Sequence, residues 1–129
     1  MVDLKHPVLG DLYFDYGWKR LGEIKLKSHV FTITYIFEAF QNESITPQQV
    51  ESYQYVDAKK DELENRIGTL LQDYIKTEGV QNASVEPQAL LFKQGGELGL
   101  LCNCSWDIEN GIVVILKPIE KVTIQDSFI

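Results

Sequence analysis

The side chains with the most distinctive chemistry in this chain are two cysteines and two histidines. Cys102 and Cys104 are separated by one residue, whereas His6 and His29 lie far away in the sequence. Zinc binds thiolate and imidazole, but its sites usually take cysteines as C-x₂₋₄-C pairs. A Cys/His nucleophile pair is a second reading, and small buried residues of a strand are the third. The C-x-C spacing favours burial, so we expect no metal, no cofactor and no catalytic residue.

The cysteine spacing also bears on location. On a strand the two thiols would share a face, with Cα atoms ~7 Å apart, too far for an easy disulfide. The first ten residues mix charge, proline and short apolar runs, unlike a signal peptide. The longest unbroken apolar run, residues 112–116, is far below the roughly 20 residues of a membrane span. We expect a reduced, cytoplasmic protein without a membrane partner.

A pair of carboxylates, Asp107 and Glu109, flanks an Asn110-Gly111 turn beside Trp106. Such a pair could share a proton or hold a hard cation. In turns, however, these side chains commonly cap backbone amides, and exposed ones contact partners. We expect a structural turn first and a partner contact through Trp106, Asp107 and Glu109 second.

A mixed charge cluster occupies residues 57–66. Its acids are Asp57, Asp61, Glu62 and Glu64, and its bases are Lys59, Lys60 and Arg66. A solvated helix face, with Arg66 near Asp61 or Glu62, is the simpler interpretation. A recognition face for a basic partner is the alternative.

Aromatic residues gather near the start of the chain, at Tyr13, Phe14, Tyr16 and Trp18. About half of them should pack in the core. Tyr16 and Trp18 lie near a turn, where one or both could serve as exposed anchors for a partner.

The overall charge excludes one class of partner. The 129 residues carry 12 Lys+Arg and 19 Asp+Glu, a net charge of −7, which makes general nucleic-acid binding unfavourable. The charge is −1 over residues 1–45 (five basic, six acidic), −3 over 46–79 (four, seven) and −3 over 80–129 (three, six). Length and composition are those of a single globular domain, 1–129.

Strand patterns open and close the chain around one helical region. Strands are expected at residues 9–15, 18–27 and 30–37, forming an antiparallel meander, with Ile24 and Leu26 facing the core. After a linker at 79–87, further strands are expected at 89–93, 98–104 and 112–116 and around residues 122–124. The fully apolar 112–116 segment should be a central strand covered on both faces.

The middle third predicts a helix or helix pair over residues 47–77. Thr46, Pro47 and Gln49 match an N-cap, a first helical position and a capping box. The polar stretch 57–62 allows a kink or short loop, and Gly79 ends the helix. The fold class is therefore α+β, with a mainly antiparallel sheet of an N-terminal meander and C-terminal hairpins.

Known phosphate-loop, zinc-protease, nucleophile-elbow and dinucleotide motifs are missing from the sequence. Gly95, Gly96 and Gly99 fit hairpin turns better than a phosphate site.

The segment 106–112 (WDIENGI), followed by 122–126 (VTIQD), resembles a widespread bacterial family of small domains with a W-D-x-E-x-G-I turn and a terminal I-G-x-Q-D-like strand. The opening 15–18 (DYGW) with Gly22 is similar to the family's first hairpin, although the spacing differs, and Thr123 stands where the family usually has glycine. The resemblance implies an immunity protein of a polymorphic toxin or contact-dependent growth inhibition system. It supplies no catalytic residues.

Charge and resemblance together predict a protein that binds and neutralises a cognate, basic bacterial toxin. The expected partner surface comprises Asp57, Asp61, Glu62, Glu64, Trp106, Asp107 and Glu109. The alternative is a small cytosolic enzyme or ligand-binding domain with a pocket between sheet and helix. A third reading is a subunit that oligomerises through an apolar strand edge.

Overall fold

The computed structural model describes residues 2–129 and contains one sheet whose eight strands follow each other in chain order. The first four strands are β1 (Leu4–His6), β2 (Gly10–Phe14), β3 (Trp18–Leu26) and β4 (His29–Phe37). The last four are β5 (Val85–Phe92), β6 (Leu98–Cys104), β7 (Ile112–Lys117) and β8 (Lys121–Ile124). Every neighbouring pair is antiparallel except β4 and β5, which run parallel.

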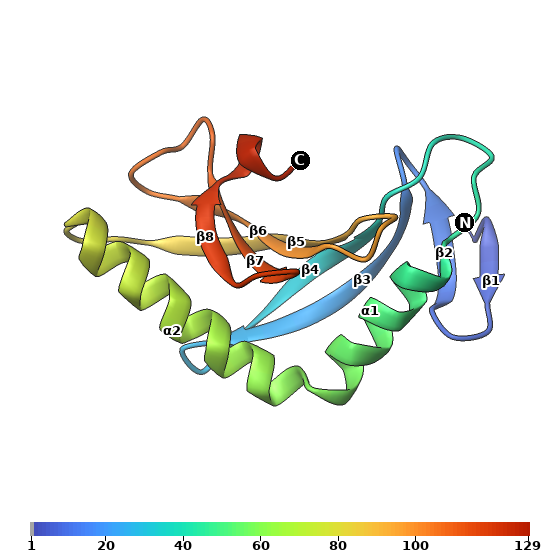
Figure 1. Ribbon diagram of the computed structural model, residues 1–129, viewed down its shortest axis with the longest axis horizontal. Coiled ribbons are helices and arrows are strands. Elements are labelled where there is room, and N and C mark those ends of the chain that lie inside the picture. Colours follow the sequence, from blue (N-terminus) through green and yellow to red (C-terminus); the bar gives the residue numbers. More distant parts are fainter. Residues whose placement is uncertain (1) are drawn as a thin grey trace.

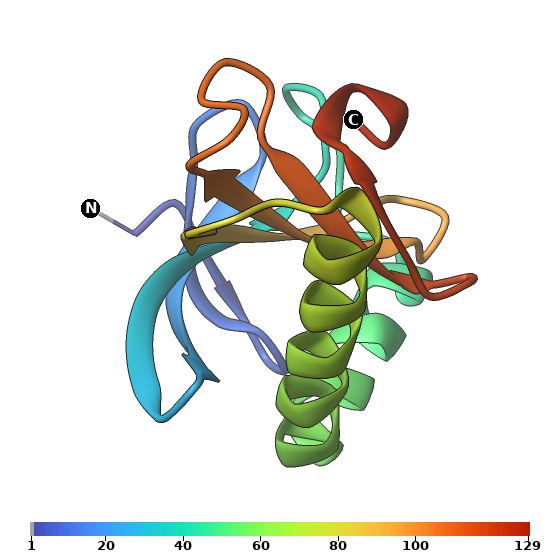
Figure 2. The same ribbon diagram turned by 90° about the vertical axis from the view of Figure 1, so that its left-hand side faces the viewer.

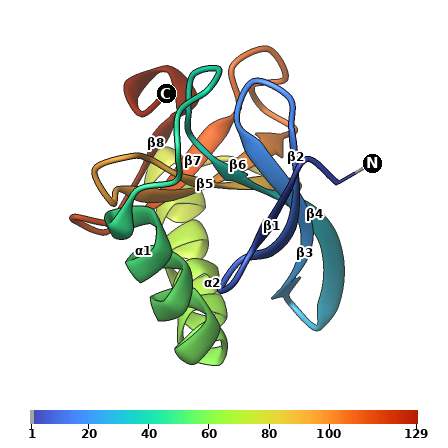
Figure 3. The same cartoon turned by 90° about the vertical axis from the view of Figure 1, so that its right-hand side faces the viewer.

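Two helices connect β4 to β5 and make that parallel pairing possible, since parallel neighbours need a long crossover. They are α1 (Pro47–Ala58) and α2 (Lys60–Glu78), and both lie on one face of the sheet (Figure 1). Turned views show the helices as one layer and the curved sheet as the other (Figures 2 and 3). The expected α+β class, mainly antiparallel, is confirmed.

Local sequence signals set the helix boundaries. The Thr46 side chain accepts a hydrogen bond from the Gln49 backbone, and the Gln49 side chain accepts one from the Thr46 backbone, as a capping box requires. The chain breaks its helical course at Lys59, within the expected kink. Gly79, at φ 66°, ends α2 in the left-handed conformation that glycine adopts without strain. The two-helix form of the prediction is therefore correct.

The main core lies between the sheet and the helices. Alternate side chains of each long strand face it, as the period of two requires, and they meet an apolar stripe on α2. Ile24 and Leu26 of β3 are buried there as expected. Other members include Phe37, Phe92, Leu100 and Val114 from the sheet and Leu63, Ile67 and Leu71 from α2.

A smaller apolar cluster covers the opposite face of the sheet. Its centre is Phe128, which follows the 3₁₀ turn η1 (Gln125–Ser127) and packs with Leu91 and Val113. The predicted burial of β7 on both faces is confirmed, because Val113 belongs to this cluster while its neighbours Ile112 and Val114 face the main core. The strand is not central, however: only β8 separates it from the sheet edge.

Several boundaries differ from the expectation. The three-residue β1 and the turn η1 carry too few residues for a periodic signal and were not anticipated. Residues 85–87, assigned to a linker, belong to β5, where a bulge near Pro87 accommodates the missing backbone donor. Among residues 2–129, neither helix is long and apolar enough to cross a lipid bilayer.

Candidate functional site

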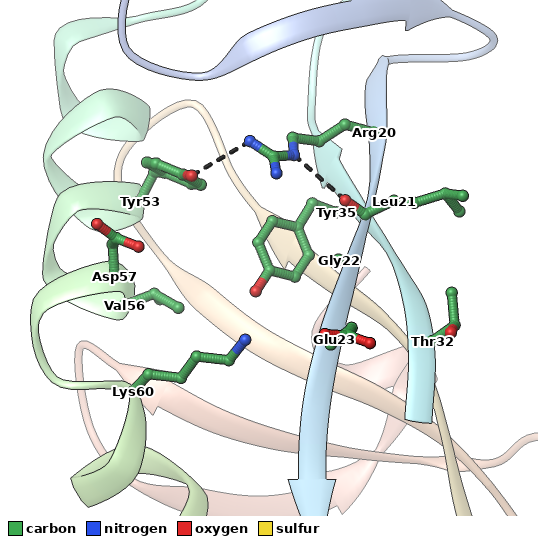
Figure 4. Close-up of a pocket in the computed structure, with 10 residues that line it drawn as sticks. All are labelled: Arg20, Leu21, Gly22, Glu23, Thr32, Tyr35, Tyr53, Val56, Asp57 and Lys60. Carbon is green, nitrogen blue, oxygen red and sulfur yellow. Dashed lines mark hydrogen bonds between the residues drawn. The ribbon is translucent and has the colours of Figure 1, made fainter. Parts of the chain in front are cut away.

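A hollow of about 410 Å³ opens between α1 and the β3–β4 pair (Figure 4). We call it the elbow pocket, because it lies beside the break between α1 and α2. Its lining comprises Arg20, Leu21, Gly22, Glu23, Thr32, Tyr35, Tyr53, Val56, Asp57 and Lys60. A pocket between sheet and helix was the structural requirement of the alternative, ligand-binding interpretation.

Arg20 holds the upper end of this pocket. Its Nη1 donates hydrogen bonds to the Leu9 carbonyl (2.7 Å) and to the Tyr53 hydroxyl (3.2 Å). Its guanidinium carbon lies 5.9 Å from the ring centre of Tyr35 and 5.7 Å from that of Tyr53. These distances are within the range of a cation–π contact, so one cation orders two tyrosines and the β1–β2 turn.

Tyr35 forms the floor of the pocket. The residue is 6% exposed, and within residues 2–129 its hydroxyl takes part in no hydrogen bond. Burial, reinforced by the neighbouring Tyr53, raises the pKa of the Tyr35 phenol to about 12 despite the opposing effect of Arg20. The hydroxyl is thus a neutral donor at ordinary pH, and Figure 4 shows it on the pocket side, toward Lys60.

A second hollow, of about 660 Å³, continues along β3 toward the β3–β4 hairpin. We call it the hairpin pocket; α2 forms its other wall, from Asp61 to Gln72. A small void in the core shares Glu23 and Lys60 with the elbow pocket and Glu64 with the hairpin pocket, so the two hollows follow each other along β3. We call the two hollows, which lie between the helices and the outer edge of β3, the groove.

The charges along this groove are balanced. The elbow pocket has Arg20 and Lys60 against Glu23 and Asp57, and the hairpin pocket has Lys25 and Lys27 against Asp61 and Glu64. The groove therefore presents both signs side by side, which selects partners by pattern rather than by net charge.

The four acids predicted for a partner surface are divided by the structure. Asp57 and Asp61 line the groove, are exposed, and take part in no ion pair within residues 2–129. Glu64 accepts a hydrogen bond from the Lys25 backbone at 2.6 Å, so it ties α2 to β3. Glu62 Oε1 lies 3.9 Å from Lys59 Nζ, in an ion pair between exposed side chains.

The predicted pairing of Arg66 with Asp61 or Glu62 is wrong. Arg66 Nε instead donates to Glu120 Oε1 at 2.7 Å, across to the β7–β8 turn. The i,i+4 spacing would allow a Glu62–Arg66 pair, but Glu62 approaches Lys59 instead, and the long Arg66 side chain reaches a carboxylate that sequence spacing does not reveal.

The other predicted surface, at Trp106, is built as a turn. Asp107 accepts hydrogen bonds from the Asn110 backbone and side chain, and its carbonyl accepts from Gly111 N, whose φ is 66°. Trp106 packs against Tyr74 of α2, with ring centres 6.5 Å apart. Glu109 is exposed. The structural interpretation of Asp107 and Gly111 is confirmed.

The two predicted surfaces lie at opposite ends of α2. Asp61 is in its first turn and Tyr74, which contacts Trp106, is in its last turns. Thirteen residues of helix correspond to about 20 Å. Asp57 and Asp61 thus lie on either side of the break between the helices, and neither adjoins Trp106, Asp107 and Glu109.

The two cysteines and the two histidines, the side chains considered for a zinc site, lie in different parts of the structure. Cys102 and Cys104 are free, buried and on the core face of β6, as expected. His6 Nδ1 accepts from the backbone of Val8 and Leu9 and closes the β1–β2 turn. His29 lines a mainly apolar hollow of about 230 Å³ that contains no carboxylate in its lining. Within residues 2–129, no three His, Cys, Asp or Glu side chains gather as a metal site requires.

The exposed aromatics were partly foreseen. Tyr16 is 94% exposed at the β2–β3 turn, whereas Trp18 is half-buried, stacks edge-on with Phe14 and donates through Nε1 to the Glu43 carbonyl. Phe40, in the loop after β4, is also exposed and was not anticipated. Tyr16 is therefore the anchor candidate, and Trp18 is not.

Sequence reasoning missed the residues that form the elbow pocket, namely Arg20, Tyr35 and Tyr53. One signal was available for Arg20: it shares the parity of Ile24 and Leu26, the core-facing residues of β3. A charged residue on the buried face of a strand must be paired or must border a cavity, and here it borders one.

Comparisons of the chain with protein-family models, with curated proteins and with solved structures found no match.

Proposed function

We propose that this protein is a cytoplasmic immunity protein that binds and neutralises a cognate bacterial toxin. The observation that carries the proposal is the pair of exposed carboxylates, Asp57 and Asp61, at the elbow between the helices. Neither has a cationic partner within residues 2–129, so both can pair with a basic protein. The net charge of −7 and the resemblance of residues 106–112 to an immunity family support the same conclusion.

Unpaired surface carboxylates act mainly on the rate of association. A basic toxin domain is drawn toward an acidic inhibitor before contact, and the attraction weakens as salt screens it. Bound at the elbow, this chain would cover the toxin's active site or a surface that the toxin needs.

The test starts from the toxin reading frame expected beside the gene. The two products should copurify, and the wild-type chain should abolish toxin activity. Asp57→Lys with Asp61→Lys should slow association at low salt and flatten its salt dependence. Asp73→Lys with Glu78→Lys is the matched control, because it changes the net charge equally and both are exposed acids of α2, about 18 Å or more from Asp61 along the helix. Failure of the wild-type chain to bind the toxin would refute the proposal.

Equal association rates for the elbow variant (Asp57→Lys with Asp61→Lys) and the control (Asp73→Lys with Glu78→Lys) would refute the elbow as the contact site. They would leave the acids Glu62 and Glu109 and the aromatic Trp106 as the remaining predicted contacts.

A second candidate function, binding of a small ligand, is favoured by the elbow pocket. Its volume of about 410 Å³ lies in the usual range for ligand sites, and Arg20, Tyr35 and Lys60 converge on it as donors. Mass spectrometry of small molecules released from the purified protein on denaturation tests it. A ligand released from wild type and absent from Tyr35→Phe supports this function, and the absence of any ligand counts against it.

A further inference from the structure

The outer edge of β3 has no strand neighbour over most of its length. β2 pairs with β3 only at Trp18 and Lys19, and then leaves to form the β1–β2 hairpin nearer α1 (Figures 1 and 3). Beyond Arg20, β3 therefore has a strand neighbour, β4, on one side only. Such an edge is a template for a further strand.

Two hydrogen bonds show which backbone groups of β3 face this edge. Lys25 N donates away from β4, to Glu64 Oε2 at 2.6 Å, and the Leu21 carbonyl accepts from Arg20 Nε at 3.2 Å. Both are odd-numbered residues, and in an antiparallel pair alternate residues direct their N–H and C=O groups to the same side. Glu23, between them, therefore presents both groups to the edge, and neither has a partner within residues 2–129.

Room for a strand exists beside Glu23. The elbow pocket is lined by outward-facing side chains of β3, Leu21 and Glu23, and also by inward-facing residues, Arg20 and Gly22. It thus borders both faces of the strand at this edge, and Figure 4 shows its lining residues between the helix and the strand. The hairpin pocket prolongs the same edge past Lys25.

A second copy of this chain is disfavoured as the occupant, because its own β3 edge is recessed beside α2, where Glu64 already accepts a hydrogen bond from Lys25 N; the charges also oppose the symmetric register. Two β3 edges paired antiparallel about Glu23 would place Glu23 directly opposite its own symmetry mate, and like charges in that position repel. The same position favours a basic side chain from a different protein. Leu21, which is 64% exposed, favours an apolar one, and Lys25 an acidic one.

We propose that an extended segment of a partner protein adds to the sheet along β3, antiparallel to it, with a basic side chain opposite Glu23 and an apolar one opposite Leu21. Antiparallel pairing is chosen because it forms two hydrogen bonds with a single residue, and Glu23 alone offers both groups. On the added strand, the residues before and after the basic one point to the opposite face, into the elbow pocket beside Arg20 and Tyr35. That the partner is a toxin rests on the proposed function.

The mode of binding can be tested without the toxin. The probe is a blocked pentapeptide, Glu-Thr-Lys-Thr-Val, whose lysine would face Glu23 in antiparallel register. Binding at millimolar peptide should shift the amide resonances of Leu21 and Glu23 and slow their hydrogen exchange. The amides of Val122 and Thr123 are the control, because they belong to β8, a terminal strand of the sheet far from β3 in the strand order. Unchanged Leu21 and Glu23 amides, or equal changes at β8, would overturn the proposal.

Two variants sharpen the test. Glu23→Pro removes the free donor but no β3–β4 hydrogen bond, and the preceding Gly22 has no Cβ to clash with the proline ring. Glu23→Pro should therefore abolish the changes in the amide resonances that the peptide causes. Glu23→Lys keeps the backbone N–H donor. This variant should no longer bind the lysine-containing peptide, but it should bind the same peptide with glutamate in place of lysine. Unchanged preference of Glu23→Lys for the lysine probe would contradict the register.

The toxin complex separates the two proposals. If the wild-type chain binds the toxin and Glu23→Pro lowers the affinity for the toxin by at least about tenfold, both proposals stand. If wild type fails to bind any toxin while the probe protects Glu23, the immunity function falls and the strand-addition site stands. If Glu23→Pro retains full toxin affinity, the immunity function stands and the toxin does not use this edge.

Discussion

The aromatic ring of Tyr35 lies against the backbone of Gly22 on the neighbouring strand, so closely that a Cβ atom at residue 22 would be 2.3 Å from Cε1 of the ring. The ring cannot retreat freely, because Arg20 and Tyr53 hold it on other sides. Gly22→Ala should therefore lower the free energy of unfolding by about 1–3 kcal/mol, measured by urea denaturation.

The control for this substitution is Gly68→Ala. Gly68 lies within α2, and no atom lies within 4 Å of the place that an added methyl group would take, so the same chemical change should stabilise by up to about 1 kcal/mol. Truncating the ring in Tyr35→Ala should remove the penalty at residue 22. An undiminished penalty in that background would contradict the contact.

A second prediction concerns Gln49, which is fully buried. Its Nε2 donates to the carbonyls of Glu38 and Phe92, and its Oε1 caps the backbone of Thr46. Gln49→Leu leaves these groups without partners and should cost about 2–5 kcal/mol in thermal or urea unfolding. Gln48→Leu, one residue earlier and exposed, should change stability by less than about 0.5 kcal/mol. Similar costs at the two positions would argue against the network.

Alkaline pH should destabilise the fold through Tyr35. Burial raises the pKa of this phenol from 10.0 to about 12, so between these values the native state keeps a proton that the unfolded chain has lost. Stability is fully retained below pH 10 and falls as pH rises, by up to about 1.4 kcal/mol per pH unit. Unfolding measured across this range should show a shallower pH dependence in Tyr35→Phe. Identical slopes would show that Tyr35 titrates normally.

The two cysteines should resist alkylation in the native state. Burial raises the pKa of Cys102 from 9.0 to about 12 and also raises that of Cys104. Because the thiolate is the reactive form, Cys102 should react with iodoacetamide about three orders of magnitude more slowly than an ordinary thiol. Denaturation in urea should release both thiols, as counted by mass spectrometry. Cys102→Ala assigns the residual native rate to Cys104, and rapid labelling of native Cys102 would refute its burial.

Local signals in the sequence were reliable where the physics is local. Thr46 and Gln49 predicted a cap because their side chains bond within four residues, and Gly111 predicted a turn because its backbone needs a positive φ. The alternation in β3 placed Ile24 and Leu26 in the core for the same reason: pleating acts residue by residue.

Relationships between distant segments were not predictable in this way. Nothing local indicates that Arg66 reaches Glu120, that β4 and β5 run parallel, or that β2 leaves β3 after Lys19. The elbow pocket depends on the last of these, since Arg20 reaches the Leu9 carbonyl where β2 has moved away. Surface acids were found from composition, but the groove beside them depends on packing.

The single parallel contact between β4 and β5 has a consequence for folding kinetics. Strands 1–4 and strands 5–8 pair only with sequence neighbours, so each half can assemble through fast, local hairpins. Joining them brings Thr34 beside Ala89, which requires closure of a long chain segment with its entropic cost.

Phe37 and Phe92 mark this seam, with ring centres 4.6 Å apart. Leucine at either position should slow folding more than it speeds unfolding, whereas truncations in β8 should mainly speed unfolding. We therefore expect the two halves of the sheet to form separately, with their meeting setting the folding rate.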